Sequence, residues 1–99
     1  MGPPVFILPK VLSDEAFERL LVQVREATES GAKEFVLALD GLAVLDSFAI
    51  RRLITLLRRT REAGGEITLA VSRVDLLRTL QVTALDKVFH LVGSAEAAA

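Results

Sequence analysis

The chain has 99 residues, of which 52% are hydrophobic and 25% are charged, and 12 basic against 13 acidic residues leave a net charge of −1. This composition is that of one small globular domain spanning residues 1–99, and it excludes a disordered chain. The nearly balanced charge gives no basis for direct binding of nucleic acid or of an anionic membrane, and the lack of cysteine excludes disulfides and thiolate metal sites.

The N-terminal residues and the single histidine bear on three further classes: secreted, membrane-spanning and metal-binding proteins. The apolar run at residues 5–8 is too short for a secretory signal or a membrane span, so we expect a cytoplasmic protein without membrane insertion. His90 alone cannot form a zinc site unless carboxylates supply most of the ligands. We therefore expect neither a metal nor another cofactor.

The predicted elements begin with a short strand and a helix. Residues 5–8 lie between Pro4 and Pro9, which favours an edge strand because proline cannot donate to a ladder. From Ser13, the expected N-cap, apolar residues recur at helical spacing until Gly31, which suits the left-handed position after a helix end. Residues 35–39 are nearly all apolar and predict a strand buried on both faces.

A second helix is expected to begin at Ser47 and to end before Gly64 and Gly65, and residues 67–71 read as the next strand. Strands separated by single amphipathic helices imply right-handed crossovers between parallel neighbours, hence an α/β layer domain. The strands and the inward stripe of the second helix predict a core that contains Phe35, Val36, Leu37, Leu39, Leu53, Ile54, Leu57, Ile67, Leu69 and Val71.

The last third of the chain continues the alternation. Ser72 with Asp75 resembles a capping box at the start of a third helix. Residues 88–92 return to a strand pattern, and Ser94 can cap a last short helix. The expected buried stripe of the third helix is Val74, Leu77 and Leu80.

Asp46 and Ser47 stand where the loop after the central strand passes into the second helix. Backbone amides at a helix start have no partners inside the helix. In a structural interpretation the Ser47 hydroxyl is the N-cap and accepts one of these amides. In a functional interpretation the same exposed hydroxyl is phosphorylated, since a helix N-terminus favours the added negative charge.

Three segments in a fixed order carry a resemblance to a known family. They are FVLALDGLAVLDSFAI, an amphipathic helix that ends in REAGGEITLAVS, and LLRTLQVTALDKVFHLV. Because independent matches multiply, their order and spacing over roughly two thirds of the chain make it resemble the STAS family, which includes anti-sigma factor antagonists and stressosome scaffold proteins. The resemblance implies a mixed, largely parallel sheet of about four to five strands with amphipathic helices packed on it.

The resemblance also implies a regulatory site. In that family the segment aligned with Asp46 and Ser47 carries a phosphorylation site, which is the target of a partner kinase that is often the anti-sigma factor. Sigma antagonists usually have a second hydroxyl residue and then glycine, whereas Phe48 and Ala49 stand here, so only Ser47 can accept phosphate. Asp-Ser-Phe is more similar to the stressosome scaffolds. The TAL sequence at residues 83–85 is similar to the Thr-Gly-Leu of the sigma antagonists, and both branches stay open.

Asp40 is a further departure from the family pattern. Many relatives have an aspartate near the end of the central strand where Ala38 stands here, and Asp40 follows two residues later. Asp40 is either a loop or turn residue or part of a partner-binding surface.

The second helix carries four arginines at seven-residue spacing, which predicts a basic stripe on one helix surface. One interpretation is a solvated face opposite the apolar stripe, and the other is a docking surface for an acidic partner. The four are Arg51, Arg52, Arg58 and Arg59.

The leading hypothesis is a non-enzymatic partner-switching module of transcription and stress regulation. It would bind a serine-kinase-type anti-sigma factor or a related kinase, and phosphorylation of Ser47 would release it. The alternative is a STAS accessory subunit of a lipid-transporting ABC system, and either function leaves a homodimer or larger assembly open. The predicted partner-binding residues are Asp40, Asp46, Ser47, Phe48, Arg51 and Arg52.

An enzyme is not favoured. Asp46, Ser47 and His90 are the residue types of a hydrolase triad, but no glycine-flanked nucleophile elbow surrounds Ser47. His90 is expected to be a partly buried strand residue. Gly64 and Gly65 precede a strand, so they do not form a phosphate loop before a helix.

Overall fold

Four parallel strands form one sheet in the order β1–β2–β3–β4, so β1 and β4 are its edges. The computed structural model describes residues 2–98. The resemblance implied about four to five strands in a mixed sheet. The sheet has four, and among the described residues no strand is antiparallel to its neighbour. In chain order the elements are β1 (Val5–Ile7), α1 (Asp14–Glu29), β2 (Glu34–Ala38), α2 (Ser47–Glu62), β3 (Glu66–Ala70), α3 (Val74–Val82), the 3-10 turn η1 (Leu85–Lys87), β4 (His90–Val92) and α4 (Ala95–Ala98).

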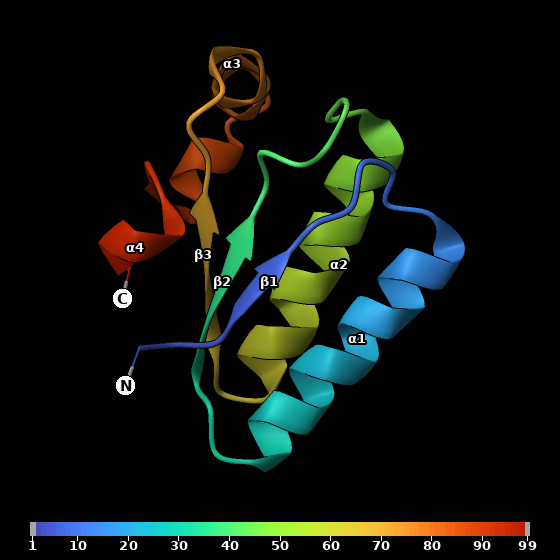
Figure 1. Ribbon diagram of the computed structural model, residues 1–99, viewed down its shortest axis with the longest axis vertical. Coiled ribbons are helices and arrows are strands. Elements are labelled where there is room, and N and C mark those ends of the chain that lie inside the picture. The colour runs from blue at the N-terminus through green and yellow to red at the C-terminus, as the bar shows by residue number, and fades with distance from the viewer. Residues whose placement is uncertain (1, 99) are drawn as a thin grey trace.

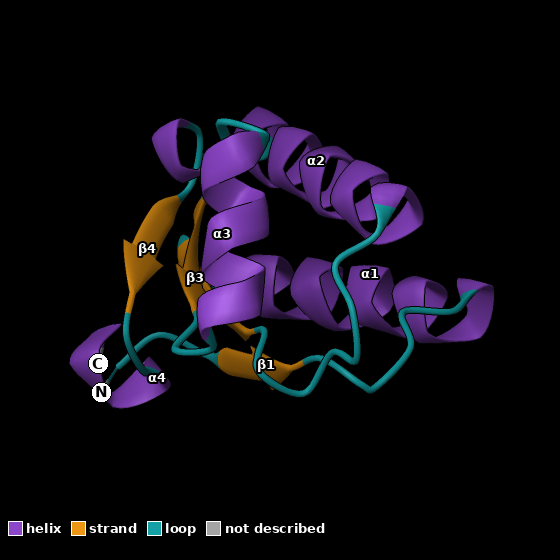
Figure 2. Ribbon diagram, turned by 90° about the horizontal axis from the view of Figure 1, so that it is seen from above, coloured by secondary structure: helices purple, strands orange, loops and turns teal. Residues whose placement is uncertain are grey.

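The helices cover the two faces of the sheet unequally. Figures 1 and 2 show α1, α2 and α3 on one face and the short α4 on the other. Phe35 and Leu37 of β2 join the main hydrophobic cluster under the three long helices, whereas Val36 between them is buried outside that cluster. Because successive strand residues point to opposite faces, Val36 lies on the face that α4 shares.

The predicted core is confirmed. Of its ten residues, nine are buried, and Ile54 is half-buried at the margin of the cluster. Leu53, at the middle of α2, has no exposed surface. The helical and strand periods of the sequence therefore identify the inward faces correctly, because each period is a property of local backbone geometry.

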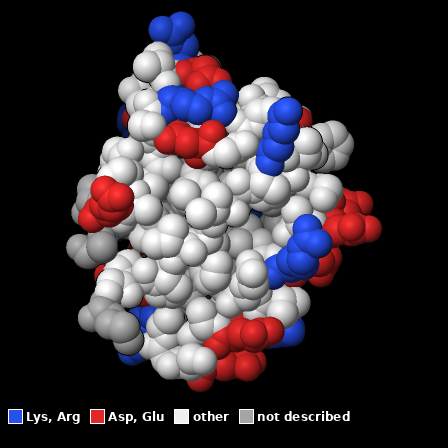
Figure 3. Space-filling model, in the orientation of Figure 1, with Lys and Arg blue, Asp and Glu red and all other residues white. Residues whose placement is uncertain are grey.

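The edge strand β1 is also confirmed, with Pro4 before it and Leu8 and Pro9 after it. Its Ile7 is 78% exposed, and the middle of the surface in Figure 3, over β1 and β2, carries no charged side chain. Prolines beside an edge strand limit pairing with a further strand because they lack an N–H group.

The ends of the first two helices follow the predicted signals. The Ser13 hydroxyl accepts a hydrogen bond from the Ala16 N–H at 3.2 Å, which confirms the N-cap of α1. Gly31 and Gly64 have φ values of +100° and +86°, conformations that side chains with a Cβ rarely adopt. They stop α1 and α2 where the sequence predicts.

The third helix differs from the prediction at its start. The N-cap position is Arg73, and no side chain caps it, so the Ser72–Asp75 capping box is wrong. The buried residues of α3 are Leu76 and Leu80, while Val74 is 69% exposed and Leu77 is half-buried. Val74 is two positions before the buried Leu76, and residues two apart on a helix point to nearly opposite sides, which explains why Val74 is exposed.

The last strand is shorter than predicted. Residues 88–92 were expected as a strand, but β4 begins only at His90, because η1 and its C-cap Val88 occupy the preceding positions. The His90 side chain is exposed and not partly buried as expected. The predicted terminal helix is present as α4.

Ala84 is the residue before η1, and it has a left-handed conformation with φ 61°. A residue with a Cβ pays roughly 1–2 kcal/mol in that conformation, whereas glycine is free to adopt it. We expect Ala84→Gly to raise the free energy of unfolding by about 0.5–1 kcal/mol in urea denaturation, after the larger entropy of glycine in the unfolded chain is subtracted.

Ala43→Gly is the matched control for Ala84→Gly. Ala43 lies in an exposed loop and is not among the positive-φ residues. Glycine there brings only its entropy cost, so the control should be no more stable than the parent. An Ala84→Gly protein less stable than the parent would contradict the inferred strain.

Candidate functional site

The loop between β2 and α2, residues 39–46, is held between two other loops. The Ala43 N–H donates to the Lys10 carbonyl at 2.9 Å, which joins it to the loop before α1. At Gly41 a Cβ atom would lie 2.5 Å from the Leu8 carbonyl oxygen, so only glycine permits this approach. The loop thus delivers Asp46 and Ser47 to a fixed place beside the start of α1.

Asp46, and not Ser47, is the N-cap of α2. Its Oδ1 accepts a hydrogen bond from the Ala49 N–H at 2.9 Å, and its backbone is extended. The predicted cap at Ser47 is therefore wrong by one position. Ser47 is the first residue of α2, exposed to solvent, and its hydroxyl makes no hydrogen bond within residues 2–98.

This geometry separates the stability roles of the two residues. We expect Asp46→Ala to lower the free energy of unfolding by about 0.5–2 kcal/mol, because the Ala49 N–H loses its acceptor. Ser47→Ala, the neighbouring control, should change it by less than about 0.5 kcal/mol, because an exposed hydroxyl without a partner contributes little. Urea denaturation at pH 7 measures both free energies of unfolding. A larger loss of stability for Ser47→Ala than for Asp46→Ala would indicate that Ser47, and not Asp46, is the N-cap.

Phe48 and Arg51 extend the exposed surface along α2. Phe48 is 64% exposed, and the Arg51 guanidinium carbon lies 5.1 Å from the centroid of its ring, a cation–π contact. Val44 and Phe48 also line an open hollow of about 420 Å³ beside the start of α2, together with Val11. We call Val11, Val44 and Phe48 the apolar patch; all three are more than half exposed.

Of the four arginines predicted to form a stripe on α2, three are exposed, and only Arg52 is half-buried. Arg52 turns toward α1, where its guanidinium pairs with Asp14 and lies 5.2 Å from the centroid of the Phe17 ring. Arg59 lines a hollow between α1 and α2. Arg51, Arg58 and Arg59 are exposed, so of the two arginines predicted to bind a partner, Arg51 and Arg52, only Arg51 is fully exposed.

Asp40 connects the β2–α2 loop to the start of α3. Its carboxylate accepts hydrogen bonds from the Ser72 N–H at 3.0 Å, the Ser72 hydroxyl at 2.5 Å and the Arg73 N–H at 3.2 Å. Desolvation acts to raise the pKa of Asp40, but the Ser72 and Arg73 hydrogen bonds and the Arg73 charge outweigh it and lower that pKa. The loop-residue interpretation of Asp40 fits this geometry, in which the carboxylate accepts hydrogen bonds from the N–H groups of Ser72 and Arg73, the two residues before α3.

Arg73 is the residue at this site that the sequence did not identify. Its guanidinium donates to the carbonyls of Leu42 and Ala43 in the β2–α2 loop and pairs with Asp75 at 2.6 Å. The Arg73 side-chain hydrogen bond is the largest cause that lowers the pKa of Asp75. The loop before Ser47 is therefore fixed from α3, through contacts between residues about thirty positions apart that no local pattern reveals.

The residue types of a hydrolase triad are not joined by hydrogen bonds in the described part of the chain, and no metal-binding cluster is found there. His90 begins β4, and no hydrogen bond joins it to Asp46 or Ser47 among the described residues. Residues 2–98 contain no cluster of three side chains suited to hold a metal ion. None of the described helices is long and apolar enough to cross a membrane.

These features define a small α/β domain whose candidate site is the exposed start of α2. A model of the STAS domain matches residues 5–98, so the chain belongs to the STAS domain family. No curated protein gives a significant sequence match.

Two solved structures of one Thermotoga maritima protein, TM1081, are similar to this chain. The NMR structure has a TM-score of 0.78 at 21% sequence identity. The match covers 95% of this chain and 76% of the chain in that structure. The crystal structure, described as that of a candidate anti-sigma factor antagonist, has a TM-score of 0.69 at 19% sequence identity. The match covers 99% of this chain and 80% of the chain in that structure. At these identities the likeness establishes the fold.

Proposed function

We propose that this STAS domain is a regulatory protein-binding module of the anti-sigma factor antagonist kind, which binds its partner when Ser47 is free and releases it when Ser47 is phosphorylated. Family membership and the description of the similar Thermotoga protein support the general role. The observation that carries the switch is the Ser47 hydroxyl, which is exposed and without a hydrogen bond at the first residue of α2.

The surroundings of Ser47 suit a phosphate that changes binding and leaves the fold intact. The Ala49 amide is already satisfied by Asp46, so phosphorylation breaks no capping bond. A phosphate brings a charge of about −1.5 to −2, which the positive end of a helix dipole favours. The Asp46 carboxylate opposes this charge, whereas Arg51, one turn further along α2, offsets it.

Arg51 couples that charge to the apolar patch. Residues four apart on a helix are neighbours, so a phosphate on Ser47 lies within reach of the Arg51 guanidinium. A charge-assisted hydrogen bond to phosphate is stronger than an exposed cation–π contact, so Arg51 leaves the Phe48 ring. A partner that fits the neutral serine beside the Phe48–Arg51 pair then meets both a new charge and a changed surface.

The test uses the immobilised parent, Ser47→Ala and Ser47→Asp proteins to capture partners from the native cell extract. We expect the parent and Ser47→Ala to retain a kinase-type ATPase, and Ser47→Asp to bind it at least about tenfold more weakly in calorimetric titration, a difference of about 1.4 kcal/mol. Mass spectrometry after incubation with that kinase and ATP should place phosphate on Ser47.

Gln23→Glu is the control for added charge, because Gln23 is exposed on α1 and the change alters one amide to a carboxylate. It should bind as the parent does. Equal affinity of the kinase for the parent and Ser47→Asp would contradict the switch. Recovery of an ABC ATPase in place of a kinase would favour the transport-accessory alternative.

A further inference from the structure

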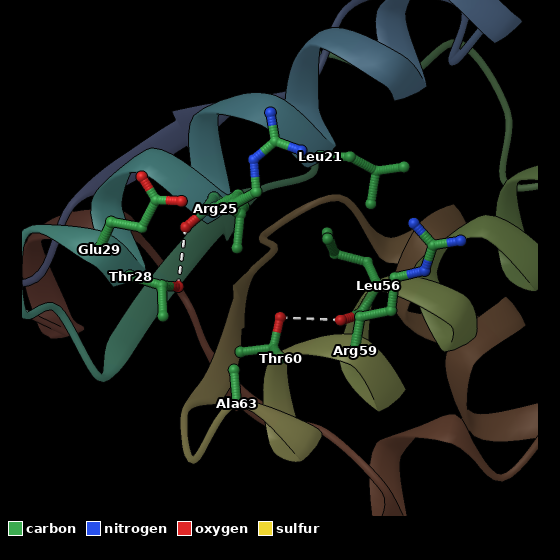
Figure 4. Close-up of a pocket in the computed structure, with 9 residues that line it drawn as sticks. Leu21, Arg25, Thr28, Glu29, Leu56, Arg59, Thr60 and Ala63 are labelled. Carbon is green, nitrogen blue, oxygen red and sulfur yellow. Dashed lines mark hydrogen bonds between the residues drawn. The ribbon is translucent and has the colours of Figure 1, made fainter.

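A second hollow lies between α1 and α2, away from the start of α2. It has a volume of about 250 Å³. Figure 4 shows residues of α1, among them Leu21 and Thr28, facing residues of α2, among them Leu56 and Thr60. This hollow plays no part in the proposed switch.

The inner wall of this hollow is apolar and offers no free donor. Leu56 and Val24 are buried, and Leu21 is half-buried. The hydroxyls of Thr28 and Thr60 donate to the Val24 and Leu56 carbonyls of their own helices, both at 2.8 Å. An anionic or carbonyl group placed deep in the hollow therefore finds no side-chain hydrogen-bond donor, whereas a hydrocarbon chain loses nothing there.

The mouth of the hollow is positively charged. Arg25 and Arg59 both line it and are exposed, and neither has an ion pair among the described residues. Glu29 also lines the hollow and opposes them with one negative charge. Two guanidinium groups from facing helices thus leave a net positive charge above an apolar wall.

We propose that this hollow binds a small amphipathic anion, a straight-chain alkyl carboxylate whose chain lies against Leu21, Val24 and Leu56 and whose carboxylate meets Arg25 and Arg59. At roughly 30 Å³ for each water-sized group, the hollow holds about eight such groups, the size of a medium-length chain. Guanidinium forks match the two oxygens of a carboxylate, and the apolar wall excludes a fully polar ion.

The probe for this site is sodium octanoate, added to the isotopically labelled full chain and followed by amide NMR shifts. We expect saturable shifts that centre on residues lining the hollow and a Kd on the order of 1 mM, in keeping with the ligand efficiency of small ligands. Affinity should rise about fourfold for each methylene from butanoate to octanoate, because each buried methylene adds a similar increment of about 0.8 kcal/mol. Octylammonium should bind at least about tenfold more weakly, since it meets the arginines with like charge.

The variants separate charge from shape. Arg25→Gln combined with Arg59→Gln should weaken octanoate binding at least about tenfold, while Arg58→Gln, the neighbouring exposed arginine outside the hollow, should leave it within about twofold. Ala63→Leu, at an exposed position that lines the hollow, should weaken binding by occupying the space.

Absence of saturation, equal binding of octylammonium, or an equal effect of Arg58→Gln and the double variant would overturn the proposal. Normal amide spectra of the free variants establish that each remains folded. None of these outcomes depends on Ser47 or on a protein partner. The anion site between α1 and α2 is therefore tested independently of the proposed switch at Ser47.

Discussion

Leu53→Ala should lower the free energy of unfolding by about 2–5 kcal/mol, through lost burial and the cavity left in the core. Leu53 lies in the middle of α2, has no exposed surface and belongs to the cluster formed with the inward residues of β2 and β3. A side chain surrounded on all sides leaves a cavity that its neighbours fill only in part. The loss is a large fraction of the total stability of a domain of this size.

Val74→Ala is the matched control for the core substitution. Val74 was predicted to lie in a buried stripe but is 69% exposed at the start of α3. Its truncation should change stability by less than about 0.5 kcal/mol. Guanidinium denaturation of the three proteins measures both effects. A Leu53→Ala midpoint equal to that of the parent would contradict the layered core. A large loss of stability in Val74→Ala would contradict the exposed position of Val74 on α3.

The sequence predicted the fold where the signal was local. The buried faces of β2, α2 and β3 follow from residue spacing alone, because the geometry of a strand or helix fixes which side chains share a face. The end of α1 was identified in the same way, since Gly31 has the left-handed conformation for which glycine is suited. The resemblance to the STAS family was confirmed by the match over residues 5–98.

The prediction failed where two signals stood one residue apart or depended on tertiary contacts. Asp46 and Ser47 are both good N-caps, and sequence preference did not decide between them. Ser72 resembled a cap of α3, but its hydroxyl donates to Asp40, a residue from another loop. This contact joins residues 32 positions apart, so it produces no periodic pattern in the sequence that could predict it.

The arginines of α2 show the same limit on the functional side. Seven-residue spacing correctly places Arg52 beside Arg59 and Arg51 beside Arg58 along the helix. It does not reveal that α1 presents Asp14 and Phe17 to Arg52. The partner-binding role of Arg51 and Phe48, and the phosphorylation of Ser47, therefore remain predictions of the proposed function.

The connection between Asp40 and α3 gives the second large effect on stability. We expect Asp40→Asn to lower the free energy of unfolding at pH 7 by about 1–2 kcal/mol. Asparagine keeps the size and one acceptor oxygen, but it loses the charge that strengthens the bonds from Ser72 and Arg73. Because Asp40 is exposed, solvent screens part of this charge, so the expected loss lies at the lower end of the range for charged hydrogen bonds.

The pH dependence identifies the charge as the cause. The folded-state pKa of Asp40 lies below its ordinary value of 3.8, so the unfolded chain binds the proton first as the pH falls. The stabilisation by Asp40 is thus complete above that ordinary value and is lost as the pH falls through the folded-state pKa. In urea denaturation the difference between the parent and Asp40→Asn should be constant from about pH 7 to about pH 5 and shrink as the pH falls below 3.8 and through the folded-state pKa of Asp40. Asp75, whose pKa is also lowered, is present in both proteins, but it shares Arg73 with Asp40, so only the part of its contribution that is independent of Asp40 cancels in the difference. A difference that stays constant as the pH falls well below 3.8 would assign the effect of the substitution to shape, and not to the carboxylate charge that joins the β2–α2 loop to α3.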